Sequence, residues 1–332
     1  MDEPTFTCPR CFFTAPLASA TRFCPRCGLP DVKQAAGDTA PLDVTSAGVT
    51  YRVEERLALG TLCNVYRCRF PSAAGEVQGV FKVARDARAN AALANEADIL
   101  RRLHHADPTG RATPFLPAFH ASLALGDGPG APPRSANVLC NHPEIRSPYE
   151  LYSLAEVRAE YSSGIDPRDM AWIWRRLLSI LSFTHASGVV HGAVLPPHVL
   201  IEPAGHKLVL VDWCWAVHRP SAGGRALDIP GCYDPWYRRE APSLRNPAPS
   251  LDVALSARCM IELTGGDPIA GRLAPNAEPA LGRYFERCLD GPRASAAHLL
   301  ADFDQLIEVL WGRRTFRPFH MPPKTSPNRK GD

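Results

Sequence analysis

The chain has 332 residues, 45% of them hydrophobic, which is enough for one substantial packed domain and a small additional module. Its formal net charge of +3 at pH 7 excludes the strongly basic composition of a dedicated nucleic-acid-binding protein. Since no apolar run reaches the length of a membrane-spanning helix and the N-terminus lacks a secretory signal pattern, we expect a cytoplasmic protein without a membrane partner. The 11 cysteines form an odd set, mostly among apolar neighbours, which argues against a disulfide framework.

Two Cys-x-x-Cys pairs stand near the N-terminus, Cys8 with Cys11 and Cys24 with Cys27. Each pair can place two thiolates on one tight turn, and two facing turns supply the four-sulfur shell that zinc prefers. The pattern resembles the zinc-ribbon family, which implies a closed structural zinc site, without catalysis, in a module over residues 1–30. A pair of disulfides and a redox-active Cys-x-x-Cys are the alternatives, and both are disfavoured because the chain shows neither a secretion signal nor a nearby βαβ pattern.

The first half of the remaining chain predicts mainly strands. Residues 31–48 have no hydrophobic period and predict a linker. From residue 51 to residue 70 the side chains alternate in the manner of a strand, a turn and a second strand, with Gly60 in the turn. A further strand is predicted over residues 79–84, and it carries Lys82. We therefore expect a small sheet directly after the linker.

A carboxylate is predicted in an apolar helix face. The Ala-rich segment from Asp86 to Leu103 predicts a helix, on which Glu96 lies three residues after Leu93 and four before Leu100. That spacing puts Glu96 in the stripe that faces inward. Because a buried carboxylate needs a cation, Glu96 is expected to have a basic partner, with a plain amphipathic helix as the alternative.

A long helix precedes the most informative segment. Asp166 is expected to cap its N-terminus, Pro167 to take its first position and Gly188 to end it. The chain then reads His191-Gly192-Ala193-Val194-Leu195-Pro196-Pro197-His198, and later Leu208-Val209-Leu210-Val211-Asp212. These two motifs, in this order after the strands and helices above, are the basis of a family resemblance.

The order of elements and the two motifs resemble the protein-kinase family, in its Ser/Thr branch, over about residues 50–310. The resemblance implies an α+β bilobal fold, with a small β-rich N-lobe over about residues 49–140 and a helical C-lobe over about residues 141–312. The zinc ribbon would precede this kinase-like domain, and a basic Pro-rich tail over residues 313–332 would follow it.

The resemblance also implies a nucleotide site, made of Gly60, Val65, Lys82, Glu96 and Asp212. In it Lys82 pairs with Glu96, and Asp212 stands where the family's Asp-Phe-Gly aspartate holds a magnesium ion, so ATP and Mg²⁺ are the cofactors implied besides zinc. Aligned on Val65, only Gly60 survives of the three glycines that cradle phosphates in the family, and a lone glycine in a hairpin is also an ordinary turn residue.

Three residues further on match structural positions of the family. Glu240 stands where the family's Ala-Pro-Glu motif ends, with the alanine and proline lost. Asp252 opens a segment similar to the family's Asp-x-x-Ser-Leu-Gly helix, and Arg293 resembles the arginine that pairs with the glutamate. These positions imply structural roles in the C-lobe.

The catalytic loop departs from the family pattern His-Arg-Asp-Leu-Lys-Pro-x-Asn. His191 is kept, but Ala193 stands in the place of the catalytic aspartate and His198 in the place of the metal-binding asparagine. Losing the general base typically costs about 10²- to 10⁴-fold in rate, so no intact catalytic residue is expected in the loop. Imidazole is a poor ligand for a hard cation, so the second magnesium ion of the family is expected to be absent. His198 is interpreted as a structural histidine, with a zinc or manganese ligand as the alternative.

The leading hypothesis is a catalytically impaired kinase-like protein, a pseudokinase, which acts as a regulatory or scaffolding protein for protein partners and binds ATP. The first alternative is an active but atypical Ser/Thr phosphotransferase. The second alternative is a zinc-ribbon nucleic-acid-binding adaptor that uses the ribbon and the tail, which has six basic residues and one acidic residue from Arg313 onward. That tail is also a candidate contact for an acidic partner.

Overall fold

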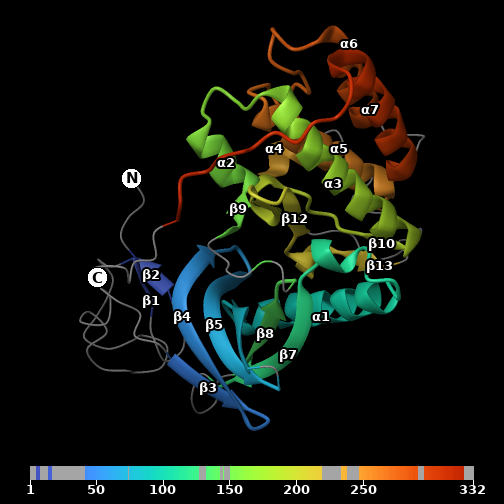
Figure 1. Ribbon diagram of the computed structural model, residues 1–332. Coiled ribbons are helices and arrows are strands. Elements are labelled where there is room, and N and C mark those ends of the chain that lie inside the picture. The colour runs from blue at the N-terminus through green and yellow to red at the C-terminus, as the bar shows by residue number, and fades with distance from the viewer. Residues whose placement is uncertain are drawn as a thin grey trace. The chain divides into compact units, whose positions relative to one another are not determined.

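The chain is described by a computed structural model, in which two compact units are present (Figure 1). Unit 1 comprises Met1–Asp98 and Ala118–Asn141, and unit 2 comprises Ile99–Pro117 and His142–Asp332. Within the residues that the structure describes, no helix is long and apolar enough to cross a membrane. The described residues are 5–7, 14–16, 42–73, 75–126, 132–142, 145, 150–218, 233–237, 247–290 and 295–324.

The N-terminal part of the chain contributes one short hairpin. Strand β1 (Thr5–Thr7) pairs antiparallel with β2 (Thr14–Pro16), with Phe6 opposite Ala15. The four cysteines that the sequence assigns to zinc, Cys8, Cys11, Cys24 and Cys27, lie outside the described residues. The zinc ribbon therefore stays a prediction.

Unit 1 is built on a six-stranded antiparallel sheet, in the order β3-β4-β5-β6-β8-β7. Strand β3 lies inside the segment 31–48 that was predicted to be a linker, so that part of the prediction is wrong. Leu42 and Val44, two residues apart, pack against the core of the sheet, which explains why this segment pairs rather than remaining a tether. The strands are β3 (Leu42–Ser46), β4 (Val49–Leu59), β5 (Cys63–Ser72), β6 (Gly75–Ala84), β7 (Ala118–Leu125) and β8 (Arg134–Cys140).

One face of this sheet forms an apolar core. Alternate residues of the central strands point into it, as the period of a strand requires. Burial of these large side chains at roughly 25 cal/mol per Å² is the main stabilising contribution of the sheet. The buried members are Tyr51, Val53, Tyr66, Cys68, Phe70, Phe81, Val83, Leu123, Ala136 and Val138.

Helix α1 (Asn90–His105) is the helix predicted from Asp86 onward. It begins later than predicted, because a short 3-10 turn over Ala87–Ala89 comes first, with the Asp86 carboxylate accepting a hydrogen bond from the Arg88 N–H. Leu93 packs with Cys63, Ala84 and Ala89 in a small apolar cluster within unit 1. The inward stripe of α1 is thus apolar around Glu96.

Unit 2 is mainly helical, with short strands. Two small sheets have the orders β12-β11-β9 and β10-β13. Its helices are α2 (Leu154–Glu160), α3 (Pro167–Ala186), α4 (Asp234–Tyr237), α5 (Pro249–Leu263), α6 (Pro279–Leu289) and α7 (Ala296–Trp311). Its strands are β9 (Tyr152–Ser153), β10 (Val189–Val190), β11 (Val199–Glu202), β12 (Lys207–Leu210) and β13 (Val217–His218).

Helix α3 confirms the capping prediction. Asp166 is its N-cap and accepts a hydrogen bond from the Arg168 N–H at 2.8 Å, Pro167 is the first helical residue, and Gly188 follows the last turn with a φ of 73°. The helix packs against α5 and α7, and the Trp174 Nε1–H donates to the Tyr284 hydroxyl at 3.0 Å. Since β10 follows directly, α3 fixes where the His191 loop begins.

Two glycines join the start of α3 to the end of α5. Gly164 has a φ of 94° and Gly265 a φ of 82°, and a Cβ on either would collide with the backbone of Thr264 or of Ser163, respectively. The Ile165 N–H donates to the Leu263 carbonyl at 2.9 Å beside this contact. The close approach therefore depends on hydrogen being the side chain at both positions.

The C-terminal segment runs along unit 2, from α7 toward α2 (Figure 1). Arg317 donates to Asp169 at 2.9 Å and to Asp166 at 3.2 Å, at the first turn of α3. Lys324 contacts Glu156 of α2 at 2.6 Å. Burial acts to raise the pKa of Glu156, but Lys324 and Ser153 outweigh it and the pKa is lowered. These cations of the predicted basic tail have acidic partners within the chain itself.

Aromatic rings fix the same segment in place. Phe316 stacks on His206 at 4.4 Å between ring centroids, and His206 stacks on Trp172 at 4.3 Å. Phe319 is buried and lies 5.5 Å from the ring of Tyr161. The described part of the tail is therefore a packed element of unit 2 and not a loose extension.

Candidate functional site

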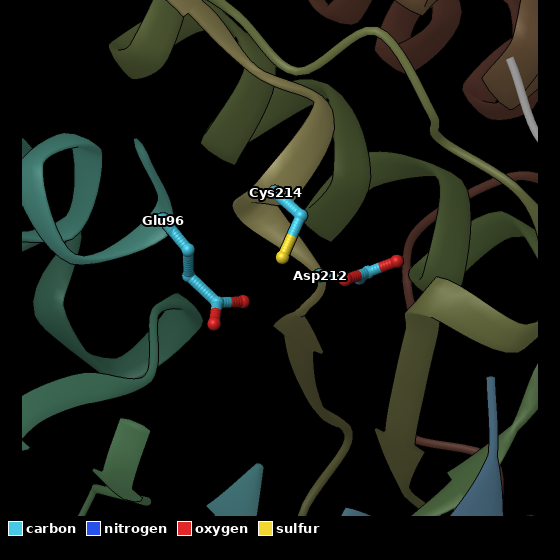
Figure 2. A group of neighbouring side chains, drawn as sticks. All are labelled: Glu96, Asp212 and Cys214. Atoms are coloured by element: carbon cyan, nitrogen blue, oxygen red, sulfur yellow. The ribbon is translucent and has the colours of Figure 1, made fainter. Parts of the chain in front are cut away.

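Unit 1 contains a buried ion pair. The Lys82 ammonium of β6 lies 2.8 Å from Glu96 Oε1 on α1, with the two side chains only 7% and 0% exposed. Figure 2 shows Glu96 projecting from that helix. The predicted pairing of Lys82 with Glu96 is therefore present, and its role toward nucleotide stays a prediction.

Asn137 of β8 completes this pair and was missed from sequence. Its Nδ2 donates to Glu96 Oε2 at 3.2 Å and to the Leu93 carbonyl at 2.9 Å, while its Oδ1 accepts from the Ser122 hydroxyl at 2.8 Å. Both oxygens of Glu96 thus have donors, as a buried carboxylate requires. The available signal was an amide residue between Ala136 and Val138, in an otherwise apolar strand.

Gly60 has a clear backbone role in the turn between β4 and β5. Its N–H donates to the Cys63 carbonyl at 2.8 Å, and a Cβ there would lie 2.7 Å from the same oxygen. Val65 is half-buried on β5, opposite Ala58 on one side and Lys82 on the other. These observations support the turn role of Gly60, and phosphate contact stays a prediction for both residues.

Asp252 holds the backbone of the degenerate loop in unit 2. Its carboxylate, fully buried, accepts from the N–H groups of His191 and Gly192, each at 2.8 Å, and lies 2.9 Å from His185 Nε2. The helix predicted to open at Asp252 begins three residues earlier, at Pro249, because proline suits the first helical position. The contacts with the loop support the structural role predicted for Asp252.

His191 is a neutral structural histidine. Its Nε2 lies 3.0 Å from the Val211 carbonyl, and its Nδ1 accepts from the Ala193 N–H at 3.2 Å, so a single proton on Nε2 satisfies both contacts. Burial lowers the pKa of His191 to about 4, and the nearby Asp252 charge opposes the shift only in part. The ring packs edge-on against Trp213, with 4.5 Å between centroids.

The position that the family resemblance aligns with the catalytic aspartate holds a buried methyl group. Ala193 is 0% exposed and can accept no proton from a substrate hydroxyl. In the described part of unit 2, the carboxylates that contact this loop are Asp212 and Asp252, and each accepts hydrogen bonds from its surroundings. Tyr237 donates to the Gly192 carbonyl at 2.9 Å, which fixes the loop further.

His198 faces an oxygen at each ring nitrogen. Its Nδ1 lies 2.8 Å from the Ala193 carbonyl and its Nε2 lies 3.1 Å from Asp212 Oδ2. Neither oxygen can donate, because one is a carbonyl and the other belongs to a carboxylate. His198 thus faces two acceptors, whereas His191 faces one donor and one acceptor.

The side chain of Asp212 already contacts two neighbouring side chains, Trp215 and His198. The Trp215 Nε1–H donates to the same Oδ2 at 2.9 Å, and Asp212 adopts a left-handed backbone conformation with a φ of 66°. Figure 2 shows the side chains of Asp212 and Cys214 leaving this turn in different directions. Magnesium prefers an octahedral set of oxygens, usually with waters. An oxygen with two nitrogen neighbours already at hydrogen-bond distance does not fit a magnesium ligand.

Some predicted residues cannot be placed, and others were not anticipated. Glu240 and Arg293 lie outside the described residues, as do the four zinc-site cysteines, so their roles stay predictions. Trp215 and His185 contact the acidic residues of the site but were not singled out from sequence. The signal for Trp215 was its position three residues after Asp212, within reach across one turn.

No protein-family model matches the chain, and no curated protein matches it. Solved structures do: 1907 chains are similar, so the fold is widely shared and identifies no function by itself. One is the crystal structure of the BubR1 kinase domain, with a TM-score of 0.58 and 14% identity, covering 81% of this chain and 83% of that one. The chain therefore has an α+β kinase-like fold, with a β-sheet N-lobe and a helical C-lobe.

Proposed function

We propose that this chain is a catalytically impaired kinase-like protein, a pseudokinase, that acts as a regulatory or scaffolding protein. The observation that carries the proposal is the buried Ala193 at the position of the general base. Without a carboxylate there, a substrate hydroxyl is neither oriented nor deprotonated, and the expected loss is roughly 10²- to 10⁴-fold. The carboxylates that contact the loop, Asp212 and Asp252, are already engaged by donors within unit 2.

The loop that lost its reactive group has kept its shape. Asp252 still holds two of its backbone N–H groups, and Tyr237 still holds a carbonyl. Buried hydrogen-bonded groups of this kind stabilise a fold whether or not the loop reacts. This favours a protein that works through its surface, with protein partners, over one that works by phosphoryl transfer.

The test is phosphoryl transfer by the purified full chain. We expect no incorporation of labelled phosphate from ATP into the chain or generic acceptor proteins with Mg²⁺ or Mn²⁺, next to an active kinase as positive control. An Ala193→Asp variant shows whether a carboxylate at this position is sufficient. Transfer by the unmodified chain that is abolished by Asp212→Asn would overturn the proposal in favour of the atypical phosphotransferase.

ATP binding is proposed as part of this function, through Lys82. Its support is the retention of the Lys82–Glu96 pair, with Asn137 as a further partner, in a fold that otherwise lost its reactive residue. Because Glu96 is fully buried, Lys82→Ala would also destabilise unit 1, so the unmodified chain is the better subject. We expect a thermal shift with ATP, a smaller one with adenosine and none with unrelated anions. Equal shifts with ATP and sulfate would contradict nucleotide binding.

A structural zinc ion is proposed for the N-terminal module. Its support is the spacing of the two Cys-x-x-Cys pairs, together with the short hairpin β1–β2, whose strands flank Cys8 and Cys11 in sequence. We expect about one zinc per chain by elemental analysis. Cys8→Ser together with Cys24→Ser should abolish it, whereas Cys140→Ser, a matched change on β8, should not.

A further inference from the structure

We infer that His198 takes the place of the metal ion in unit 2, so that Asp212 binds no divalent cation and nucleotide association with this chain is independent of Mg²⁺. The nucleotide half of this inference depends on the proposed function, whereas the metal half concerns only Asp212, His198 and Trp215. The fold resemblance implies a magnesium ligand at Asp212, and the geometry of these three side chains disagrees with it.

The first step is how His198 is aimed. Its Nδ1 is fixed by the Ala193 carbonyl at 2.8 Å, which leaves the ring little freedom to rotate. The opposite nitrogen, Nε2, then points at Asp212 Oδ2, 3.1 Å away. The side chain of His198 is 15% exposed, so most of the ring is enclosed. The carbonyl that aims the ring belongs to the residue that replaced the catalytic aspartate.

The second step is the occupancy of Asp212. A carboxylate oxygen offers about two lone-pair directions. On Oδ2 one is used by His198 and the other by the Trp215 Nε1–H at 2.9 Å. A metal ion at this oxygen would have to displace both side chains.

The third step is the chemistry of the replacement. In the kinase family the residue at this place is an asparagine, whose side-chain oxygen can ligate a second magnesium. Imidazole offers a hard cation no oxygen. His198 therefore both removes an oxygen ligand and lies against the carboxylate oxygen that remains, at 3.1 Å. Trp215 secures the arrangement from the other side.

The experiment measures Mn²⁺, as the probe metal, on the full chain by water-proton relaxation, without nucleotide. The Mn²⁺ affinity of each chain is compared with that of the same chain carrying Asp212→Asn, and the difference is the Mn²⁺ binding that depends on Asp212. In the unmodified chain we expect no difference. In His198→Asn, which restores an oxygen ligand and releases Oδ2, we expect overall Mn²⁺ binding on the order of tenfold tighter than in the unmodified chain, and the whole of this gain should depend on Asp212.

Separate controls keep the two halves distinguishable. His198→Gln serves as a second variant if His198→Asn folds poorly, and His320→Asn is a matched change at an exposed histidine of the tail. Asp212-dependent binding in the unmodified chain would overturn the inference, and so would its absence in both folded His198 variants.

The nucleotide arm compares the ATP affinity of the unmodified chain in Mg²⁺ and in EDTA. Equal affinities support the inference, and an affinity lost in EDTA overturns it. If ATP fails to bind in either condition, the proposed nucleotide contact falls, and with it the nucleotide half of the inference. The Mn²⁺ comparison still decides the metal half.

Discussion

Two residue pairs of the candidate site, one in each unit, differ in how far the sequence anticipated them. In unit 1, Lys82 and Glu96 form the pair expected from the family resemblance, with side chains 7% and 0% exposed. In unit 2, Asp212 and His198 form a pair that was not expected, with side chains 23% and 15% exposed. The first pair is the one that the resemblance implies, and the second is a contact that the resemblance does not imply.

The difference shows what constrains each residue. Removing one partner of a buried ion pair leaves a charge without compensation, so Lys82 and Glu96 are needed for folding even where no phosphoryl transfer occurs. Asp212 lies nearer to solvent, and its partners could change without leaving a fully buried charge. A Lys–Glu pair at this place is therefore weak evidence for catalysis in this fold.

The largest expected effect tests the first half of the comparison. Lys82→Met should lower the free energy of unfolding by about 3–5 kcal/mol, because Glu96 would remain buried with only Asn137 as a partner. Chemical denaturation of the full chain measures the loss. The double variant Lys82→Met with Glu96→Gln should recover part of it, since no isolated charge remains.

The matched control is a surface pair in the same unit. Arg88 lies 3.0 Å from Asp86, with its side chain 92% exposed, so Arg88→Met should cost only a small fraction of the loss expected for Lys82→Met. If Lys82→Met cost no more than this control, the buried pair would not constrain the fold and the contrast between the units would disappear.

The second effect concerns the anchor of the loop. Asp252→Asn should lower the free energy of unfolding by about 1.5–3 kcal/mol, because an amide accepts through one oxygen only and the carboxylate serves His191, Gly192 and His185. Urea denaturation gives the size of the loss. Ser256→Ala, one turn later on α5, removes a hydroxyl that donates only to the Val253 carbonyl and should cost less. Equal losses in the two variants would argue against a special role for Asp252.

The third effect is a pH dependence of the free energy of unfolding that comes from His191. Its pKa is about 4 in the folded chain against an ordinary value of 6.5, mainly through burial, with Asp252, His198 and Asp212 as the charged groups that face it. The unfolded chain takes up a proton below pH 6.5 while the folded chain does not. Stability is therefore highest above pH 6.5 and falls by about 1.4 kcal/mol per unit as the pH drops toward 4.

Denaturation curves at several pH values measure this slope. His191→Gln should flatten it over the same range, since the titrating group is gone. His206, whose pKa is also lowered by burial, adds to the slope with the same sign, so some dependence should persist in that variant. A curve for the unmodified chain that is no steeper than the curve of His191→Gln would contradict the neutral state assigned to His191.

The smallest effect comes from the C-terminal segment. Arg317→Ala should cost about 0.2–1 kcal/mol, because its ion pairs with Asp166 and Asp169 are partly exposed to solvent and screened by salt. Thermal unfolding at low and high salt measures the cost, which should shrink at high salt. Arg313→Ala, at an exposed position of the same segment, is the control and should show no such salt dependence.

Local chemistry made part of this structure predictable. Asp166, Pro167 and Gly188 define the ends of α3 because capping and backbone preference act within a few residues. The position of Glu96 in an apolar helix stripe, which the sequence pattern predicts, indicated a cationic partner. The family resemblance identified Lys82 as that partner. The loss of the general base is predicted from the residue type of Ala193 alone, and it stays a prediction.

The remainder depends on contacts between distant segments. Strand β3 was missed because a short edge strand needs only Leu42 and Val44 to join a core, and two apolar residues are a weak signal. Asn137 and Trp215 were missed because nothing local shows which acidic residue each will reach. The tail was interpreted from its net charge as a candidate contact for an acidic partner. Arg317 and Lys324 instead form ion pairs with carboxylates more than 100 positions earlier in the chain.

The meeting of Gly164 and Gly265 sets a limit on how sequences with this architecture can diverge. His198 contacts the Ala193 carbonyl and Asp212 through its side chain, whose identity can change without a collision of backbones. Neither glycine offers such latitude, because the main chain of one segment fills the space where the other would carry its first carbon. Among related sequences, we expect substitutions to accumulate in the loop around Ala193 well before they reach this crossing of two backbones.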